Sequence, residues 1–235
     1  MADPQIKFST KDAIASLVIG EIVAWLLIAM IKNLNLAISS QIVWSLPVVF
    51  PILCIIGLYI AYLISKKIPV IYQVAKFVLV GGLNTLMDWG VLAFLIILFD
   101  SYLGIKFGDT LLVVFSVTIA YYSLYKSISF IVASINSYLW NKFWTFQRQT
   151  TEKVGREFIQ FFVITVIGFL LNVGIASIIL KLVTPIGGLP DGSRWPILAA
   201  VIATAFSMVW NFVGYKFIVF NVGREKNAGL SIPSS

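Results

Sequence analysis

Long apolar runs separated by short polar loops extend along most of the chain. A helix needs about 20 mostly apolar residues to cross a bilayer. Runs of this kind lie at 13–31, 42–64, 77–99, 158–182 and 197–220. A sixth, shorter run lies at about 127–144. The pattern therefore predicts an all-α polytopic membrane protein with about six spans.

The stretch from 110 to 146 is harder to divide, because it is too long for one span and short for two. Tyr121, Tyr122, Tyr125 and Lys126 interrupt it, and such residues are common at membrane interfaces. We interpret 110–122 as an interfacial or re-entrant helix that precedes the fourth span. Two short crossings here would instead give seven spans.

Composition supports the membrane interpretation. Of 235 residues, 60% are hydrophobic and 11% are charged, whereas a soluble domain carries about 25% charged residues. The chain has no histidine and one cysteine, which excludes histidine acid–base catalysis, most zinc sites and an intrachain disulfide. We see neither a phosphate-binding loop nor a soluble stretch long enough for a nucleotide-binding domain. We therefore expect no enzyme activity and no cofactor.

The 17 basic residues are distributed unevenly between the two sides of the membrane. With six spans, twelve fall on the side of the termini and five on the other. Because basic loops stay in the cytoplasm, we expect a multi-pass protein of the cell membrane with both termini cytoplasmic. We attribute the net charge of +7 to loops that face anionic lipid, not to nucleic-acid binding.

The last four predicted spans are two copies of one unit. A shift of 84 residues aligns the third span with the fifth, so that Asn84 meets Gly168 and Asp88 meets Asn172. A shift of 74 aligns the ends of the fourth and sixth spans, so that Lys142-Phe143 meets Lys216-Phe217. We predict parallel repeats at 71–148 and 156–222, related by an axis along the membrane normal. They form a four-helix domain, 71–222, between an N-terminal transmembrane hairpin, 1–70, and a cytoplasmic tail, 223–235.

The segment Lys76-Phe-Val-Leu-Val-Gly-Gly-Leu-Asn84-Thr-Leu-Met-Asp88 resembles the first helix of the GtrA-like family. The segments Ser137-Tyr-Leu-Trp-Asn-Lys-Phe-Trp-Thr-Phe146 and Asn211-Phe-Val-Gly-Tyr-Lys-Phe-Ile-Val-Phe220 resemble its paired helix endings. The resemblance covers about 74–220. It implies a small membrane protein of cell-surface polysaccharide synthesis that moves polyprenyl-phosphate-linked sugars. The same four-helix unit also anchors some dolichol- or polyprenyl-phosphate sugar transferases.

This chain departs from the family pattern at several positions. The N-terminal hairpin and the 110–122 segment are additions. The motif arginines are replaced by Lys142 and Lys216, and Tyr215 stands where the second family asparagine would be. Lysine keeps the charge of arginine but loses its bidentate phosphate geometry.

Asp88 is the strongest candidate for a functional residue, because placing an ionisable side chain within a membrane span costs free energy. Asn84 lies one turn earlier on the same face, and Asn172 occupies the matching place in the second repeat. These residues could bind a sugar or phosphate headgroup, or Asp88 could couple transport to protons. Alternatively, they form hydrogen bonds between helices.

The second group of candidates lies at the ends of the spans and consists of Asn141, Lys142, Asn211 and Lys216. Their lysines could capture a lipid phosphate, or could anchor the helix ends at the interface. For Lys76 and Arg156 we favour simple anchoring. Glu21 in the first span could face a cavity, pair with another chain or be protonated against lipid.

The resulting hypothesis is a flippase-like carrier of polyprenyl-phosphate sugars, in contact with membrane lipids and working as a homo-oligomer. The alternative is a non-catalytic scaffold or anchor for a partner glycosyltransferase. A third possibility is a small proton-coupled exporter, in which Asp88 or Glu21 would be essential.

Overall fold

The computed structural model describes residues 7–148, 154–182 and 194–220. The chain divides into two compact units, Met1–Gln147 and Arg148–Ser235. The predicted cytoplasmic tail, 223–235, lies outside the described residues.

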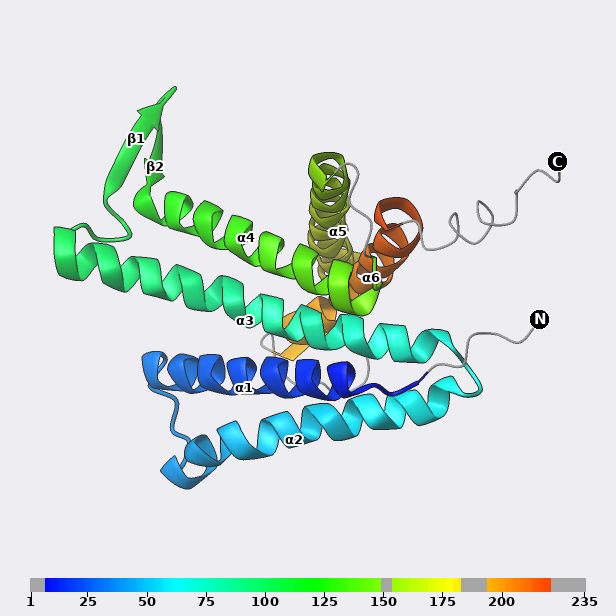
Figure 1. Cartoon of the computed structure of the whole chain (residues 1–235). Coiled ribbons are helices and arrows are strands. Elements are labelled where there is room, and N and C mark those ends of the chain that lie inside the picture. The colour runs from blue at the N-terminus through cyan, green and yellow to red at the C-terminus, as the bar shows by residue number, and fades with distance from the viewer. Residues whose placement is uncertain (1–6, 149–153, 183–193, 221–235) are drawn as a thin grey trace. The chain divides into compact units, whose positions relative to one another are not determined.

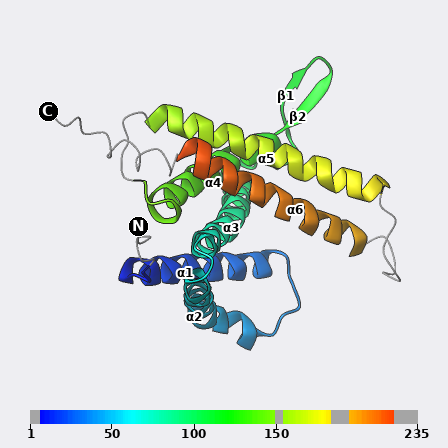
Figure 2. The same ribbon diagram turned by 90° about the vertical axis from the view of Figure 1, so that its right-hand side faces the viewer.

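In the first unit, α3 (Val70–Leu103) lies between the hairpin of α1 (Thr10–Asn33) and α2 (Ser40–Ser65) on one side and α4 (Tyr121–Trp140) on the other (Figures 1 and 2). The helix α1 begins with a capping box, in which the side chains of Ser9 and Asp12 bond to each other's backbone N–H groups. The helix α3 ends at Gly104, whose φ of 64° is accessible to glycine without strain.

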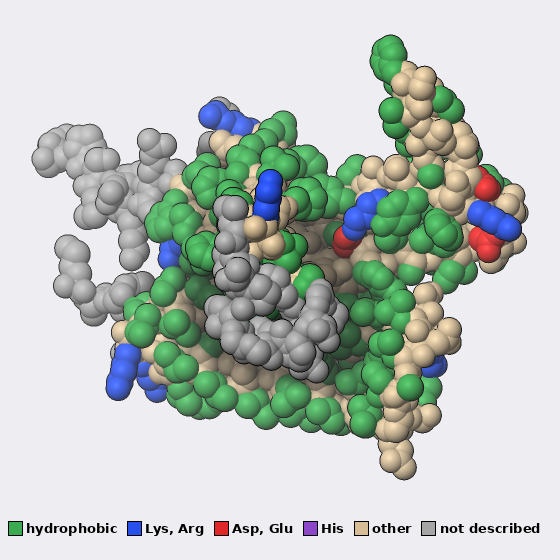
Figure 3. Space-filling view, turned by 180° about the vertical axis from the view of Figure 1, so that it is seen from behind, with side chains coloured by type: hydrophobic (Ala, Val, Ile, Leu, Met, Phe, Trp, Pro, Cys, Tyr) green, Lys and Arg blue, Asp and Glu red, His purple; other side chains and the backbone are tan. Residues whose placement is uncertain are grey.

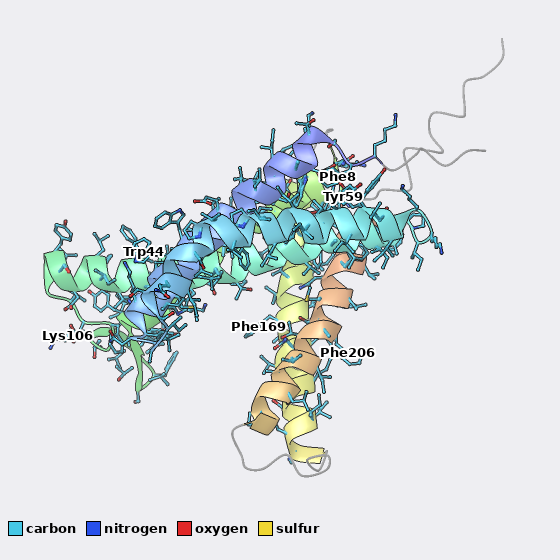
Figure 4. All side chains as sticks on the ribbon, turned by 90° about the horizontal axis from the view of Figure 1, so that it is seen from below. Phe8, Trp44, Tyr59, Lys106, Phe169 and Phe206 are labelled. Carbon is cyan, nitrogen blue, oxygen red and sulfur yellow. The ribbon has the colours of Figure 1, made fainter. Side chains whose placement is uncertain are left out.

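The added hairpin packs tightly and shares a core with the first repeat. A β-carbon on Gly20 of α1 would lie 2.5 Å from the Pro51 Cα of α2, so only glycine fits there. The core joins buried residues from α1, α2, α3 and the end of the α4 segment: Ile19, Val23, Leu58, Tyr72, Val80, Leu83 and Trp144. At one end of α2, Phe8 meets Tyr59 edge-on, with ring centroids 5.5 Å apart (Figure 4).

The prediction of a helix at 110–122 is wrong. These residues form an antiparallel β-hairpin of β1 (Thr110–Val114) and β2 (Val117–Ala120), which projects sideways from the ends of α3 and α4 (Figure 1). The segment is rich in β-branched residues, which favour strands. The two-residue loop Phe115–Ser116 has positive φ at both positions, 46° and 66°, the sign that a type I′ hairpin turn requires.

The second unit contains α5 (Val154–Leu182) and α6 (Arg194–Gly214), which lie side by side along their lengths (Figure 4). Gly214 allows this close approach, because a β-carbon there would lie 2.6 Å from the Ile164 Cγ2. Phe169 and Phe206 project from the outer surfaces of the two helices (Figure 4) and are 59% and 61% exposed. Such side chains suit contact with lipid.

The prediction of an all-α polytopic membrane protein is confirmed at the level of architecture. Five described helices are long and apolar enough to cross a membrane, namely α1, α2, α3, α5 and α6. Hydrophobic side chains cover much of the surface in view (Figure 3). The helix α4 is more polar, but its 20 residues continue into a π-helical turn of 5 residues, η1 (Asn141–Thr145). Together they form a rod of about 37 Å, which is long enough to span the hydrocarbon core.

Candidate functional site

Each repeat ends in the same unusual backbone turn. The helix α4 is followed by η1, and α6 is followed by η2 (Tyr215–Val219). In both turns the residue that follows, Phe146 or Phe220, donates its N–H to the first carbonyl of the turn at 2.8 Å. The two turns are related by the 74-residue shift seen in the sequence. Because π-helical turns are rare and frequently occur at functional sites, this end of each helix pair is the first candidate site.

The second residue of each turn is a lysine held between aromatic rings. Lys142 Nζ lies 5.3 Å from the centroid of the Tyr138 ring and 5.8 Å from that of Phe143. It also donates a hydrogen bond of 3.0 Å to the Tyr138 hydroxyl. Its side chain is almost fully buried. Rings within about 6 Å attract a cation through their negative faces, so the turn holds the ammonium in a defined place.

Lys216 repeats this arrangement in the second unit. Its Nζ lies 5.5 Å from the Phe212 ring centroid and 5.7 Å from that of Phe217. In both turns one ring comes four residues before the lysine and the other comes directly after it. Lys216 is only partly buried, so the second site is the more accessible of the two.

The asparagines of the turn regions are packed inside the helix pairs. The Asn141 Nδ2 donates to the Ser137 carbonyl at 2.9 Å and to its hydroxyl at 3.2 Å. The Asn211 carboxamide lies against Gly168, where a β-carbon would come within 2.3 Å of Oδ1. Within the part of the chain that the structure describes, the Oδ1 atoms of Asn141 and Asn211 are buried and accept no hydrogen bond.

Asn84 carries a third buried amide oxygen that accepts no hydrogen bond from the described residues. The 84-residue shift places Asn84 opposite Gly168, and the 74-residue shift places Ser137 opposite Asn211. At this position the first repeat therefore has an asparagine on α3, and the second has one on α6. By this alignment, Asn84 and Asn211 place a buried amide oxygen at corresponding positions of the two helix pairs.

Asp88 forms an ion pair that the sequence did not reveal. Its Oδ2 pairs with the Nζ of Lys126 on α4, and its Oδ1 accepts a hydrogen bond of 2.7 Å from the Ser129 hydroxyl. Lys126, which the sequence suggested only as an interfacial residue, is therefore the partner of Asp88. The α4 partners of Asp88 could not be found from its own helix, because they lie about 40 residues further along the chain.

Asn172 occupies the corresponding position in the second unit. Its Nδ2 donates to the Thr204 hydroxyl at 3.1 Å, in an exposed part of the pair formed by α5 and α6. Both repeats thus make a polar contact between their helices at this level. The contact is ionic in the first repeat and neutral in the second.

A buried cluster joins the added hairpin to the first repeat. The Asp12 carboxylate pairs with Lys76 and accepts a 3.0 Å hydrogen bond from the Trp144 indole. Lys76 is 2% exposed and its Nζ lies 4.4 Å from the Tyr72 ring centroid. The expectation that Lys76 anchors α3 by reaching out to the interface is therefore wrong. The Ser9-x-x-Asp12 spacing was a visible signal for the cap, but not for the distant lysine.

Glu21 lies on the outer surface of α1, where its Oε1 accepts a 2.8 Å hydrogen bond from the Trp25 indole in an exposed environment. The Trp25 side chain is 50% exposed. This bond within one helix satisfies part of the hydrogen-bonding capacity of the Glu21 carboxylate.

Comparison with known protein families adds one match. The family model described as GtrA/DPMS, transmembrane domain, matches residues 76–220, which is more than half of the chain. The match begins at Lys76 and ends at Phe220, the residue that closes the second π-helical turn. No solved structure matches the chain.

Proposed function

The chain belongs to the GtrA/DPMS transmembrane-domain family, which has a membrane role in polyprenyl-linked sugar and polysaccharide pathways, and we propose that it moves polyprenyl-phosphate-linked sugars across the bilayer. The proposed movement needs no covalent step, so we assign no catalytic residue. The prenyl chain would stay in the surrounding lipid while the polar headgroup passes along the helices.

The observation that carries this proposal is the repeated lysine turn. A sugar joined to a lipid through a phosphodiester carries one negative charge, which an ammonium group can bind as a point charge. Lys142 and Lys216 occupy the same position of the same turn, each between two rings. Rings that already hold the ammonium reduce the side-chain entropy lost when a phosphate binds.

Polar groups further along the helices suit the sugar. Sugar hydroxyls are hydrogen-bond donors, and the buried Oδ1 atoms of Asn84 and Asn211 are acceptors with no partner among the described residues. An unsatisfied buried acceptor costs free energy, so a hydroxyl group that reached it would be bound favourably. Asn172 and its Thr204 partner offer a further polar contact near the surface.

Transport by purified protein in sealed vesicles tests this proposal. Proteoliposomes are given a water-soluble short-chain prenyl phosphate that carries a radiolabelled hexose, and uptake is compared with that of protein-free vesicles. Lys142→Gln and Lys216→Gln should each lower the initial rate about tenfold or more, because a hydrogen bond to a charged group is lost. Lys106→Gln is the matched control, since Lys106 lies outside the turns in the loop after α3.

The competing function is a scaffold or anchor for a glycosyltransferase. In that case vesicles with the wild-type chain take up the probe no faster than empty vesicles. The chain would instead co-purify with the transferase irrespective of the lysine substitutions. We expect the opposite result in the uptake assay, and equal uptake by wild type and both lysine variants would refute the role given to the turns.

A further inference from the structure

The Asp88–Lys126 pair joins α3 to α4 in the first repeat. Lys126 on α4 precedes Lys142 in η1 by 16 residues, which corresponds to about 24 Å of helix. Along α3, Asp88 follows Lys76 by 12 residues, or about 18 Å. The ion pair is therefore far from the lysine turn and within the apolar part of α3.

Helix packing alone does not require a charged pair at this level. The second repeat makes its contact with the neutral amide of Asn172 and the hydroxyl of Thr204. Ionisable side chains within membrane helices are costly and usually mark pathways for ions or substrates. The charges in the first repeat thus point to a use beyond joining α3 to α4.

The pair is also accessible, unlike the buried pair of Asp12 and Lys76. The side chain of Lys126 is 43% exposed and that of Asp88 is 24% exposed, whereas the side chains of the other pair are 3% and 4% exposed. An ammonium group has three donors, and Asp88 occupies one of them. Lys126 can therefore turn toward an incoming anion without unfolding the helix pair.

We propose that Lys126 is a second binding station for the lipid phosphate, far from the lysine turn of the first repeat, and that Asp88 is a positioning residue that holds it there. This inference rests on the proposed function. Before a phosphate binds, Asp88 neutralises Lys126, and Ser129 donates a hydrogen bond to the same carboxylate. When the phosphate arrives, Lys126 exchanges the carboxylate for the phosphate, and Ser129 continues to bond Asp88. The carboxylate and the phosphate thus compete for one ammonium group.

This competition predicts that substitutions at the two residues have opposite effects on binding. Binding is measured by titration calorimetry in detergent micelles, with farnesyl phosphate that carries a single hexose as the probe. Lys126→Gln should weaken binding about tenfold or more, because the cationic donor is lost. Asp88→Asn should tighten binding several-fold, because the competing charge is removed and an amide of similar shape remains. A purely structural ion pair predicts instead that both variants weaken binding through the same loss of packing.

Two further variants separate binding from folding. The double variant Asp88→Asn/Lys126→Gln leaves a neutral pair like that of the second repeat, so it should keep the helical circular dichroism and melting temperature of the wild type. It should still bind as weakly as Lys126→Gln. If the double variant binds like the wild type, Lys126 does not contact the phosphate and the inference is overturned.

Failure of this inference can be distinguished from failure of the proposed function. If the wild type binds no prenyl phosphate, the proposed function fails and this inference fails with it. If it binds the probe and Lys142→Gln weakens binding while Lys126→Gln does not, only the second station is refuted. Phosphatidylglycerol serves as a competitor with the same phosphate charge. If it displaces the probe equally well and shows the same opposite effects, Lys126 is an anion station for ordinary phospholipid.

Discussion

Removing the Asp12 carboxylate should strongly destabilise the first unit. Asp12 is 3% exposed, pairs with Lys76 and accepts the 3.0 Å bond from Trp144. It also accepts a 2.7 Å bond from the Ser9 hydroxyl. Asp12→Ala would leave the buried ammonium of Lys76 without its counter-charge. Loss of one partner of a buried ion pair costs about 3–5 kcal/mol of unfolding free energy, and loss of the Asp12 half of the capping box adds to this cost.

A double-mutant cycle tests whether the pair itself is responsible. Unfolding is followed by circular dichroism in mixed micelles with increasing amounts of a denaturing detergent. Asp12→Leu and Lys76→Met should each cost several kcal/mol, but together they should cost far less than the sum of the two. An apolar pair of similar volume can replace a buried ion pair at little cost or even with a gain in stability. We expect a coupling energy of about 2 kcal/mol or more between these two positions.

Lys11→Ala provides the control for this cycle. Lys11 is next to Asp12 in the first turn of α1, but it is exposed, so its removal should change stability by less than about 0.5 kcal/mol. The reasoning is refuted if the two single substitutions add within about 0.5 kcal/mol, or if Asp12→Leu alone is as mild as Lys11→Ala.

Two further predictions concern the backbone and packing. Replacing Phe115–Ser116 by Asn-Gly, the dipeptide that best fits a type I′ turn, should stabilise the β-hairpin by about 1 kcal/mol. The amides of the hairpin should then exchange their hydrogens more slowly. Unchanged exchange rates would contradict the conclusion that the Phe115–Ser116 turn is strained. Gly168→Ala should lower the stability of the second unit by about 1–3 kcal/mol, because its methyl group collides with Asn211. Gly174→Ala has open space around it and should leave thermal unfolding in detergent almost unchanged, so equal effects of both substitutions would rule out the collision.

The features that follow from local pattern were predictable from the sequence. Apolar runs of about 20 residues give the helices directly, because a membrane span needs that length. The 74-residue shift that aligned Lys142 with Lys216 also aligned two turns with the same backbone conformation. The hairpin at 110–122 was missed because a short apolar run such as Leu-Leu-Val-Val fits a strand as well as a buried helix. The positive φ of Phe115 is contrary to the preference of aromatic residues, so no turn signal was visible.

Pairs of charges that meet across helices were not predictable. Asp12 and Lys76 are separated by a whole helical hairpin in the sequence, and each looked like an ordinary residue at a helix end. In the sequence Lys126 looked like an interfacial lysine. Its pairing with Asp88 depends on the packing of α4 against α3, which the sequence does not show. The type of a charged residue and its position along one helix do not determine which neighbouring helix its side chain will contact. The partners of buried charges therefore had to come from the three-dimensional structure.

The two repeats have the same backbone ending but differ in where they carry charge. Both close with a π-helical turn and a lysine between rings. Among the residues that the structure describes, the first has the Asp88–Lys126 ion pair further along, at the level where the second has Asn172 and Thr204. A lipid-linked sugar with one phosphodiester has one charge and many hydroxyls. One charged pair and one neutral polar pair match this chemistry better than two charged ones, since a second ion pair would add desolvation cost without a second phosphate to bind. The asymmetry thus fits the proposed substrate, and Asn172→Asp should cost stability without improving binding of the prenyl phosphate probe.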